Sequence, residues 1–245
     1  MKHLLLLGLI LLLAACGVPE ESTPAPTPEA IQVVYPAALK PWADKFAGCA
    51  STNPLVALYF NQSPGVDTNI DPNIVVLEFG EPTQKEGISY LSQVGLEQIA
   101  LIVNQDNNLS KLSSDTFQSI YSGQTQSWDG DSGQRIQVWV LPNGDPVRMY
   151  LDSAVLDSYP LTSEAHLAPD PEAMLEAISR DTNAIGYLPG SFLTSGDPAL
   201  VSKIKNIQLD ASLKEELNQP IVAMTQTEPS GLMRELLVCV QAAIP

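Results

Sequence analysis

From residue 31 onward, short apolar runs alternate with segments whose apolar residues recur at helical spacing. Such runs predict buried β-strands. The predicted strands are Ile31–Tyr35, Leu55–Phe60, Ile74–Phe79, Gln98–Asn104, Ile136–Leu141, Ala184–Leu188 and Pro220–Thr225. Strands that alternate with helices along a chain indicate an α/β fold.

Helix start and stop signals lie between these strands. Small polar residues at the N-cap and proline in the first turn are typical of helix starts, and glycine is typical of helix ends. The predicted helices are Pro41–Ala47, a helix capped by Ser113 and ended by Gly123, a helix from Asp145-Pro146 to about Leu156, a helix opening at Asp170-Pro171 with Met174, Ala177 and Ile178 inward, and a final helix capped by Ser230 with Leu232, Leu236, Cys239 and Val240 on one side.

Residues 1–30 carry a different pattern. A basic start precedes the apolar run Leu4–Ala15, which ends in Leu-Ala-Ala before Cys16. As a helix this run reaches about 18 Å, which is too short for a hydrocarbon core of about 30 Å, and its three parts are typical of a secretory signal. The ending resembles the lipobox of bacterial lipoproteins, and this resemblance implies cleavage after residue 15 and acylation of Cys16. An ordinary signal peptide that happens to contain a cysteine is the alternative.

The remaining N-terminal segment, residues 16–30, includes four prolines and three glutamates and cannot form a core. We therefore expect it to be a semi-rigid tether between the lipid and the folded part. Together with the signal, it predicts an extracytoplasmic protein that is lipid-anchored to a bacterial membrane.

Charge and cysteine content narrow the function further. The net charge of −16 argues against nucleic acid and against an electrostatic hold on anionic lipid. Of three cysteines, Cys16 is assigned to lipid, which leaves Cys49 and Cys239 as an even pair in an oxidising compartment. We favour a disulfide between them, and two buried thiols are the alternative.

Several segments in the second half of the chain resemble the phosphate-binding proteins of ABC importers. The segments are Ile99–Asn107, the helix that ends at Ile120-Tyr121-Ser122-Gly123, Trp128, the strand Ile136–Leu141, Asn183–Tyr187, and Gln219–Val222 with Pro229-Ser230-Gly231. The resemblance implies a type II periplasmic-binding-protein fold, in which two α/β lobes are joined by two crossing hinge strands. Lobe 1 would comprise residues 31–102 plus 220–245, and lobe 2 would comprise residues 103–219. The crossings would fall near Leu101–Asn104 and Pro220–Thr225. Cys49 and Cys239 would both lie in lobe 1, which agrees with their pairing.

The same resemblance implies a function. A monomer would hold a small-molecule solute in the cleft between the lobes, close on it by hinge motion, and deliver it to an ABC permease. In this family, backbone amides and hydroxyl groups at helix N-termini hold the phosphate, because free N–H groups and the helix dipole favour an anion.

The three ligand loops depart from the family pattern in this chain. The first is Tyr35-Pro36-Ala37-Ala38, without hydroxyl groups of Ser or Thr, and the second is Glu78-Phe79-Gly80-Glu81-Pro82, which offers carboxylates. The third is Asn143-Gly144-Asp145-Pro146-Val147-Arg148. The candidate ligand residues are Tyr35, Ala37, Gly80, Glu81, Asn143, Gly144, Asp145 and Arg148.

Asp145 would cap its own helix and place a carboxylate where phosphate binds. Two unit charges about 4 Å apart at an effective dielectric of about 20 repel by about 4 kcal/mol, which removes roughly three orders of magnitude in affinity. Arg148 is the one cation near this cleft. It would hold an oxyanion, or it would pair with Asp145 or Asp152 on a solvated helix face.

Catalysis is not expected. His166 is the single histidine after the signal, Gly-x-Ser-x-Gly is absent, and no metal-ligand cluster or cofactor motif stands out. Two hypotheses remain. The first is a tethered solute receptor whose ligand is not simple phosphate. The second is a lipoprotein that kept the binding-protein scaffold for sensing or envelope interaction, without a transport ligand.

Overall fold

One mixed β-sheet runs through the whole molecule. The computed structural model describes residues 27–63, 71–82, 88–128, 134–157 and 159–243. In this part of the chain, nine strands form the order β2-β1-β3-β11-β4-β8-β6-β7, with β9 paired to β4, while β5 and β10 form a separate pair. The strands are β1 (Glu29–Tyr35), β2 (Val56–Gln62), β3 (Ile74–Phe79), β4 (Tyr90–Asn104), β5 (Lys111–Leu112), β6 (Gln137–Val140), β7 (His166–Leu167), β8 (Ala184–Pro189), β9 (Ile204–Asn206), β10 (Gln208–Leu209) and β11 (Asn218–Thr225).

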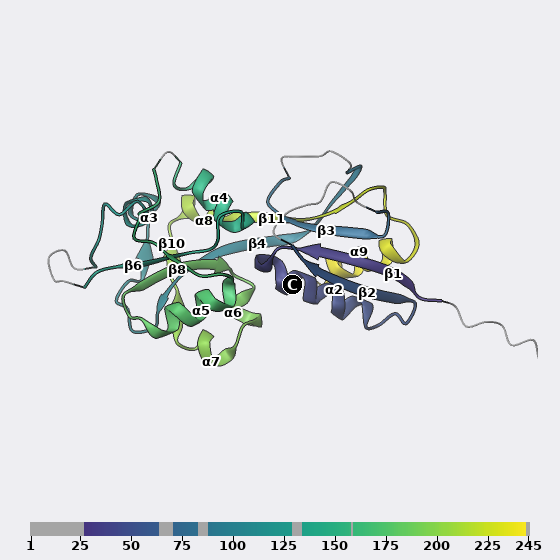
Figure 1. The fold of residues 1–245 in the computed structure, drawn as a ribbon, viewed down its shortest axis with the longest axis horizontal. Coiled ribbons are helices and arrows are strands. Elements are labelled where there is room, and N and C mark those ends of the chain that lie inside the picture. The colour runs from purple at the N-terminus through teal and green to yellow at the C-terminus, as the bar shows by residue number, and fades with distance from the viewer. Residues whose placement is uncertain (1–26, 64–70, 83–87, 129–133, 158, 244–245) are drawn as a thin grey trace, which may run out of the picture.

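Helices flank both halves of this sheet (Figure 1). They are the 3-10 helix η1 (Ala37–Leu39), α2 (Lys40–Ala50), α3 (Ser114–Tyr121), α4 (Pro146–Ala154), α5 (Pro171–Arg180), α6 (Phe192–Ser195), α7 (Pro198–Val201), α8 (Ala211–Glu216) and α9 (Gly231–Ala242). The α/β fold predicted from the sequence is confirmed.

The long strand β4 joins the two halves of the sheet. Up to Gln98 it pairs with β11, and from Ile99 it pairs with β8. We call β1, β2, β3, β11 and the first part of β4 the first half, and β6, β7, β8, β9 and the rest of β4 the second half; Figure 1 shows β4 running between them. The crossing implied by the family resemblance, near Leu101–Asn104, lies too late, because residues from Ile99 onward already pair with β8.

The return crossing also lies earlier than predicted. Throughout its length β11 pairs with β3 and the first part of β4, so Pro220–Thr225 lies entirely within the first half. The chain passes back between α8 and β11, where the Ile99 amide donates to the Leu217 carbonyl at 2.9 Å. The two crossing points are therefore hydrogen-bonded neighbours. Where the lobes divide as moving units stays a prediction.

Local caps fix where several helices begin. Ser113 Oγ accepts from the Thr116 amide, as the sequence predicted. Asp170 Oδ1 accepts from the Ala173 amide at the start of the helix that was predicted to open there. The prediction for α9 was wrong in part, because Ser230 occupies the N-cap position but its side chain makes no capping hydrogen bond. The buried face of α9 consists of Met233, Leu236, Leu237 and Val240.

A disulfide ties the start of the folded chain to its end. Cys49 at the end of α2 is bonded to Cys239 in α9, with 5.9 Å between the Cα atoms. The predicted disulfide is therefore present, and the alternative of two buried thiols does not hold. Helices α2 and α9 pack together on the first half of the sheet, and the disulfide links them covalently.

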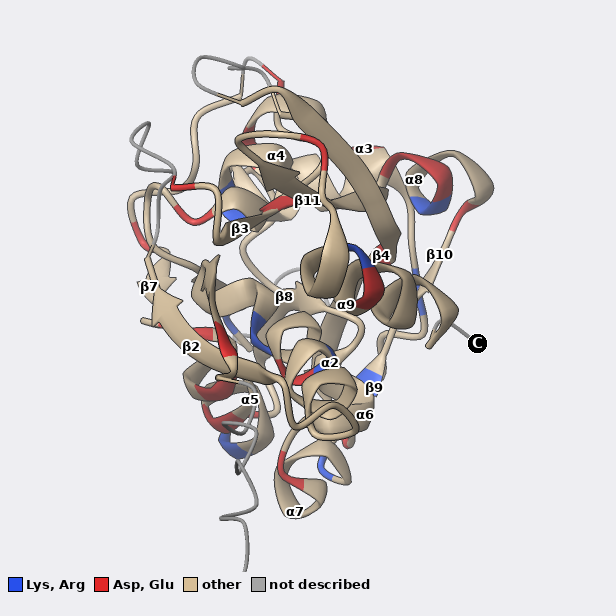
Figure 2. Cartoon of the chain, turned by 90° about the vertical axis from the view of Figure 1, so that its right-hand side faces the viewer, with Lys and Arg blue, Asp and Glu red and all other residues tan. Residues whose placement is uncertain are grey.

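The predicted N-terminal segments lie almost wholly outside the described residues. These are the signal at residues 1–15, Cys16, and the tether up to residue 26. Strand β1 begins at Glu29, so the last residues of the predicted tether, 29–30, are part of the sheet. In the described ranges, no helix is both long and apolar enough to cross a membrane. Acidic residues are spread over the molecule, for example on α5 and α8 (Figure 2).

Candidate functional site

The loops that carry the predicted ligand residues lie where the two halves of the sheet meet. Strands β1, β2 and β3 are parallel in the first half, and β6, β7 and β8 are parallel in the second. Loops at the carboxyl ends of parallel strands are the usual ligand-binding position in open α/β sheets. Here η1, which follows β1, lies against β3 and β8, and α4, which follows β6, lies against β3.

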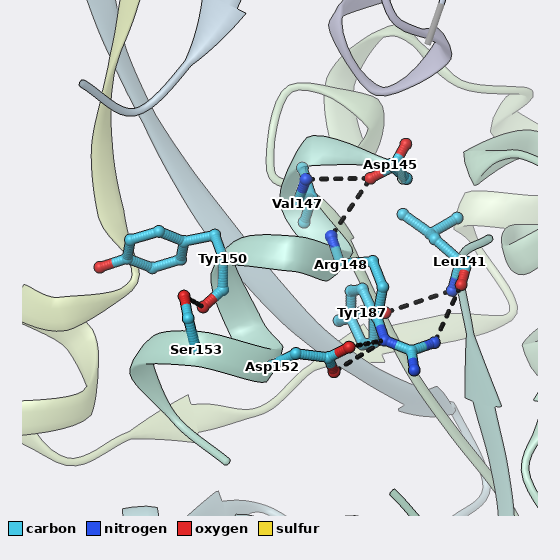
Figure 3. A network of polar contacts seen from close by, with 8 residues as sticks. All are labelled: Leu141, Asp145, Val147, Arg148, Tyr150, Asp152, Ser153 and Tyr187. Atoms are coloured by element: carbon cyan, nitrogen blue, oxygen red, sulfur yellow. Dashed lines mark hydrogen bonds and ion pairs between the residues drawn. The ribbon is translucent and has the colours of Figure 1, made fainter. Parts of the chain in front are cut away.

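The N-terminus of α4 is occupied by the chain's own carboxylate. Asp145 Oδ1 accepts from the Val147 amide at 2.9 Å and from the Arg148 amide at 3.2 Å (Figure 3). Pro146 has no N–H to offer. An anion therefore finds the donors at the start of this helix already bonded, as the sequence predicted from the capping position.

Asp145 is also strongly buried, with 8% of its surface exposed. Burial raises the pKa of its carboxyl group from 3.8 to about 6, although the hydrogen bonds from the Arg148 and Val147 amides oppose the shift. At neutral pH the group carries a negative charge in the same place where a phosphate-binding protein needs a positive field.

The Arg148 side chain forms its hydrogen bonds with groups of the second half, to which α4 belongs. Its Nε donates to both carboxylate oxygens of Asp152, at 2.7 and 2.6 Å, and its Nη1 donates to the Leu141 carbonyl at 3.1 Å. The predicted alternative of a pair with Asp152 is thus the observed one. The prediction of a solvated face was wrong, because the Arg148 side chain is 11% exposed.

The same network holds the loop between β6 and α4. The Leu141 amide donates to the hydroxyl oxygen of Tyr187 at 3.2 Å, so both backbone groups of Leu141 are bonded to side chains (Figure 3). Burial raises the pKa of the Tyr187 hydroxyl far above its usual range. The guanidinium therefore fixes this loop through its Nε and Nη1 groups.

The second ligand loop contacts α4 through an aromatic pair. The rings of Phe79 and Tyr150 lie edge to face, with centroids 5.8 Å apart. The Tyr150 hydroxyl accepts from Gln219 Nε2 and donates to the Glu216 carbonyl, both at 2.6 Å. Gly80 has a φ of +79°, which favours glycine, and its amide donates to the Pro220 carbonyl. The contacts of Tyr150 with Phe79 and Gln219 join the two halves without any ligand.

The remaining candidate residues fall into two groups: Asn143 and Gly144 directly precede α4, and the others belong to the first two loops. Tyr35 packs edge to face on Phe60 of β2, with centroids 6.2 Å apart, and Ala37 belongs to η1. Glu81 and Asn143 are exposed, and within the described ranges neither side chain makes a hydrogen bond. Gly144 has a φ of +97°, so its role is to turn the chain into α4. The structure thus packs the second loop on α4, the helix that follows the third loop, whereas the Tyr35 ring packs on β2.

A buried carboxylate that the sequence analysis missed connects the two halves at the crossing. Glu97 of β4 is 4% exposed. Its Oε2 accepts from Trp42 Nε1 of α2 at 2.6 Å, and its Oε1 accepts from the Ser191 amide, just after β8, at 3.0 Å. Gly95 lets the ring lie against β4, because a Cβ there would be 2.0 Å from a ring carbon of Trp42. Hydrogen bonds to a charged group are the stronger ones, so this contact stabilises the relative position of the halves.

His166 is exposed, stacks on Trp139 with centroids 5.0 Å apart, and bonds to the Gln137 side chain. It lies in the edge strand β7. Among the described residues, no group of His, Cys, Asp and Glu side chains is arranged to hold a metal ion.

Solved structures with the same fold are binding and regulatory proteins. One is described as a phosphate ABC transporter substrate-binding protein with bound phosphate, from Clostridium perfringens; it has 16% identity and a TM-score of 0.69 over 86% of this chain and 93% of that chain. An ABC-type phosphate transport receptor from Vibrio cholerae has 16% identity and a TM-score of 0.62, over 87% of this chain and 93% of that one.

A third similar structure is the CcmR regulatory domain of Synechocystis PCC6803 in complex with 2-PG. It has 12% identity and a TM-score of 0.62, over 87% of this chain and 96% of that chain. These likenesses show the fold alone. No curated protein sequence matches this chain significantly.

The family model described as "PBP superfamily domain" matches residues 83–234. This segment includes all of β4, the rest of the second half, β11 and the start of α9. Because it exceeds half of the chain, the protein belongs to the PBP superfamily domain family.

Proposed function

We propose that this protein is a lipid-anchored, extracytoplasmic solute-binding protein whose ligand is not simple phosphate. The family and the fold support a binding role rather than catalysis. The single observation that carries the ligand argument is the hydrogen bonding of Asp145 to the Val147 and Arg148 amides. The chain's own carboxylate takes the position in which an oxyanion would be held.

The cellular setting follows from the N-terminal sequence. Acyl chains on Cys16 would anchor the protein, and the proline-rich segment would hold the folded part away from the lipid surface. The disulfide between Cys49 and Cys239 fits an oxidising, extracytoplasmic compartment. In this proposal the protein acts as a monomer and delivers its solute to an ABC permease.

Two electrostatic features argue against orthophosphate. Above about pH 6 Asp145 is ionised, so a phosphate at the start of α4 would meet a like charge at hydrogen-bonding distance. The nearby cation Arg148 does not offset this charge, because it already forms an ion pair with Asp152. A neutral polar solute would meet neither obstacle.

The experiment compares thermal unfolding of the detergent-purified full-length protein with and without orthophosphate. A ligand at about 100 times its dissociation constant stabilises by about 2.7 kcal/mol. We expect no shift with the wild-type protein and a shift with Asp145→Ser, which removes the charge and keeps a capping oxygen. Asp170→Ser is the matched control, because Asp170 caps α5 in the same way. A wild-type shift with orthophosphate would contradict the proposal.

A lipoprotein without a transport ligand is the second candidate. The observation in its favour is that the halves are already joined by the chain's own groups, through Tyr150 with Gln219 and through Glu97. A thermal-shift panel of sulfate, molybdate, sugars and amino acids separates the two. A saturable shift with one solute supports the receptor, and no shift with any of them favours a sensing or envelope role.

A further inference from the structure

A pocket lies at the end of the second half that is opposite to the three ligand loops. We propose that it binds a neutral saccharide. A cavity of about 370 Å³ lies there, between the end of β4 and the segment that precedes β8. This volume falls in the range of small-molecule sites, about 300–1,000 Å³. None of the described residues that line it belongs to the three ligand loops.

The floor of this pocket is fixed by a buried amide. Asn107 is 7% exposed. Its Nδ2 donates to the Thr182 carbonyl at 2.7 Å, and its Oδ1 accepts from the Leu109 amide at 2.8 Å. The Asn107 carbonyl in turn accepts from the ammonium group of Lys205. The loops on the two sides of the pocket are therefore held together in one arrangement before a ligand arrives, which lowers the entropic cost of binding.

One wall of the pocket is an indole ring in a fixed orientation. Trp128 Nε1 donates to the Asn183 carbonyl at 3.1 Å, and Asn183 also lines the pocket. The face of an aromatic ring carries negative partial charge, whereas the C–H bonds on the face of a sugar ring are weakly positive. A half-buried, oriented indole beside polar groups is therefore suited to the apolar face of a saccharide.

The polar side chains that line the pocket have unused hydrogen-bonding capacity. Within the described ranges, no hydrogen bond is formed by the Asp106 carboxylate, by the side-chain amides of Asn108 and Gln134, or by the Thr182 hydroxyl. Amides and hydroxyls both donate and accept, and a carboxylate accepts. Sugar hydroxyls, which also do both, can satisfy such a set, whereas a ligand with only donors or only acceptors cannot.

The groups that line the pocket favour a neutral polyhydroxylated ligand over an anion or an organic cation. No Lys or Arg is among the described lining residues, and Asp106 adds a negative charge to a chain that already carries −16. An anion would therefore meet the like charge of Asp106, while the ammonium group of Lys205 is already engaged by the Asn107 carbonyl. An organic cation would use Trp128 and Asp106 but would leave the neutral amides unpaired. A neutral polyhydroxylated ring uses the indole, the amides and the carboxylate together.

The test is saturation-transfer difference NMR on the detergent-purified full-length protein. The probes are D-glucose, N-acetyl-D-glucosamine and maltose, with tetramethylammonium as the cationic control. We expect at least one saccharide to bind saturably, with a dissociation constant near 1 mM, which corresponds to about −4.1 kcal/mol. The variants Asp106→Ala and Thr182→Val change exposed groups of the pocket, and each is expected to weaken binding by about tenfold, the value of one hydrogen bond.

Matched controls separate this pocket from the rest of the molecule. Tyr59→Ala removes an aromatic side chain that is 61% exposed on β2, in the first half, and should leave saccharide binding unchanged. Asp145→Ser changes the N-cap of α4, outside this pocket, and should also leave saccharide binding unchanged. Failure of all three saccharides to bind, equal binding by Asp106→Ala, Thr182→Val and wild type, or binding of tetramethylammonium alone would overturn the proposal.

Discussion

Replacing Asp145 by asparagine isolates the energetic effect of a single buried charge. Asparagine is as good an N-cap as aspartate, and its side-chain oxygen can accept from the Val147 and Arg148 amides as the carboxylate does. The substitution therefore keeps the cap and the shape of the site, and it removes only the ionisation.

The expected magnitude follows from the pKa of Asp145. Its carboxyl pKa rises from 3.8 to about 6 on folding. The folded state then binds more protons than the unfolded state across this window, so stability falls as pH rises through it. A shift of about 2 units corresponds to about 3 kcal/mol, which is fully expressed above about pH 6 and absent below about pH 4.

We therefore expect Asp145→Asn to be more stable than wild type at neutral pH. The gain is about 3 kcal/mol at most, or roughly 6–12 °C in Tm for a chain of this size. Urea unfolding followed by circular dichroism at a series of pH values measures it. Asp170→Asn makes the same exchange at the less buried cap of α5. If Asp145→Asn is less stable than wild type at neutral pH, or if the difference is independent of pH, the burial argument is refuted.

Three further changes test the scaffold. Glu97→Gln leaves one of two donors facing an amide NH2 group, and should lower stability by about 2 kcal/mol in urea unfolding. Replacing Cys49 and Cys239 by serine opens a loop whose ends are 190 residues apart, which should cost about 5 kcal/mol on the loop-entropy model and lower the calorimetric Tm. Gly95→Ala places a methyl group 2.0 Å from a ring carbon of Trp42, and should shift the indole fluorescence and destabilise the fold.

The sequence predicted best those elements whose signals are local. The caps at Ser113, Asp145 and Asp170 lie within three residues of the amides they bond, so the local sequence is enough to show that a helix starts there. The first part of β4 was missed, since between Tyr90 and Gln98 polar residues interrupt the apolar pattern. Short elements such as β5, β7, β9 and β10 have too few residues to show any period.

The contacts that join the halves were beyond sequence reasoning because they are non-local. Glu97 and Trp42 are separated by 55 residues, and Gln219 and Tyr150 by 69. A single acidic residue inside an apolar strand does not reveal which indole and which amide it will meet. Tyr35, by contrast, was expected at the ligand site from the family resemblance of its loop, but its ring packs on Phe60, a residue of the neighbouring strand.

The position of Asp145 makes pH a direct probe of what the cleft accepts. An oxyanion at the start of α4 competes with the Asp145 carboxylate for the same amides. The oxyanion avoids like-charge repulsion only in those protein molecules whose Asp145 is protonated. Above about pH 6 that fraction falls about tenfold per pH unit, so the apparent affinity for sulfate, whose own charge is constant in this range, must fall equally. A neutral solute carries no such penalty. Isothermal titration at two pH values therefore distinguishes an anion receptor that is blocked by its own carboxylate from a receptor for neutral solutes, because only the first loses affinity as the solution becomes more alkaline.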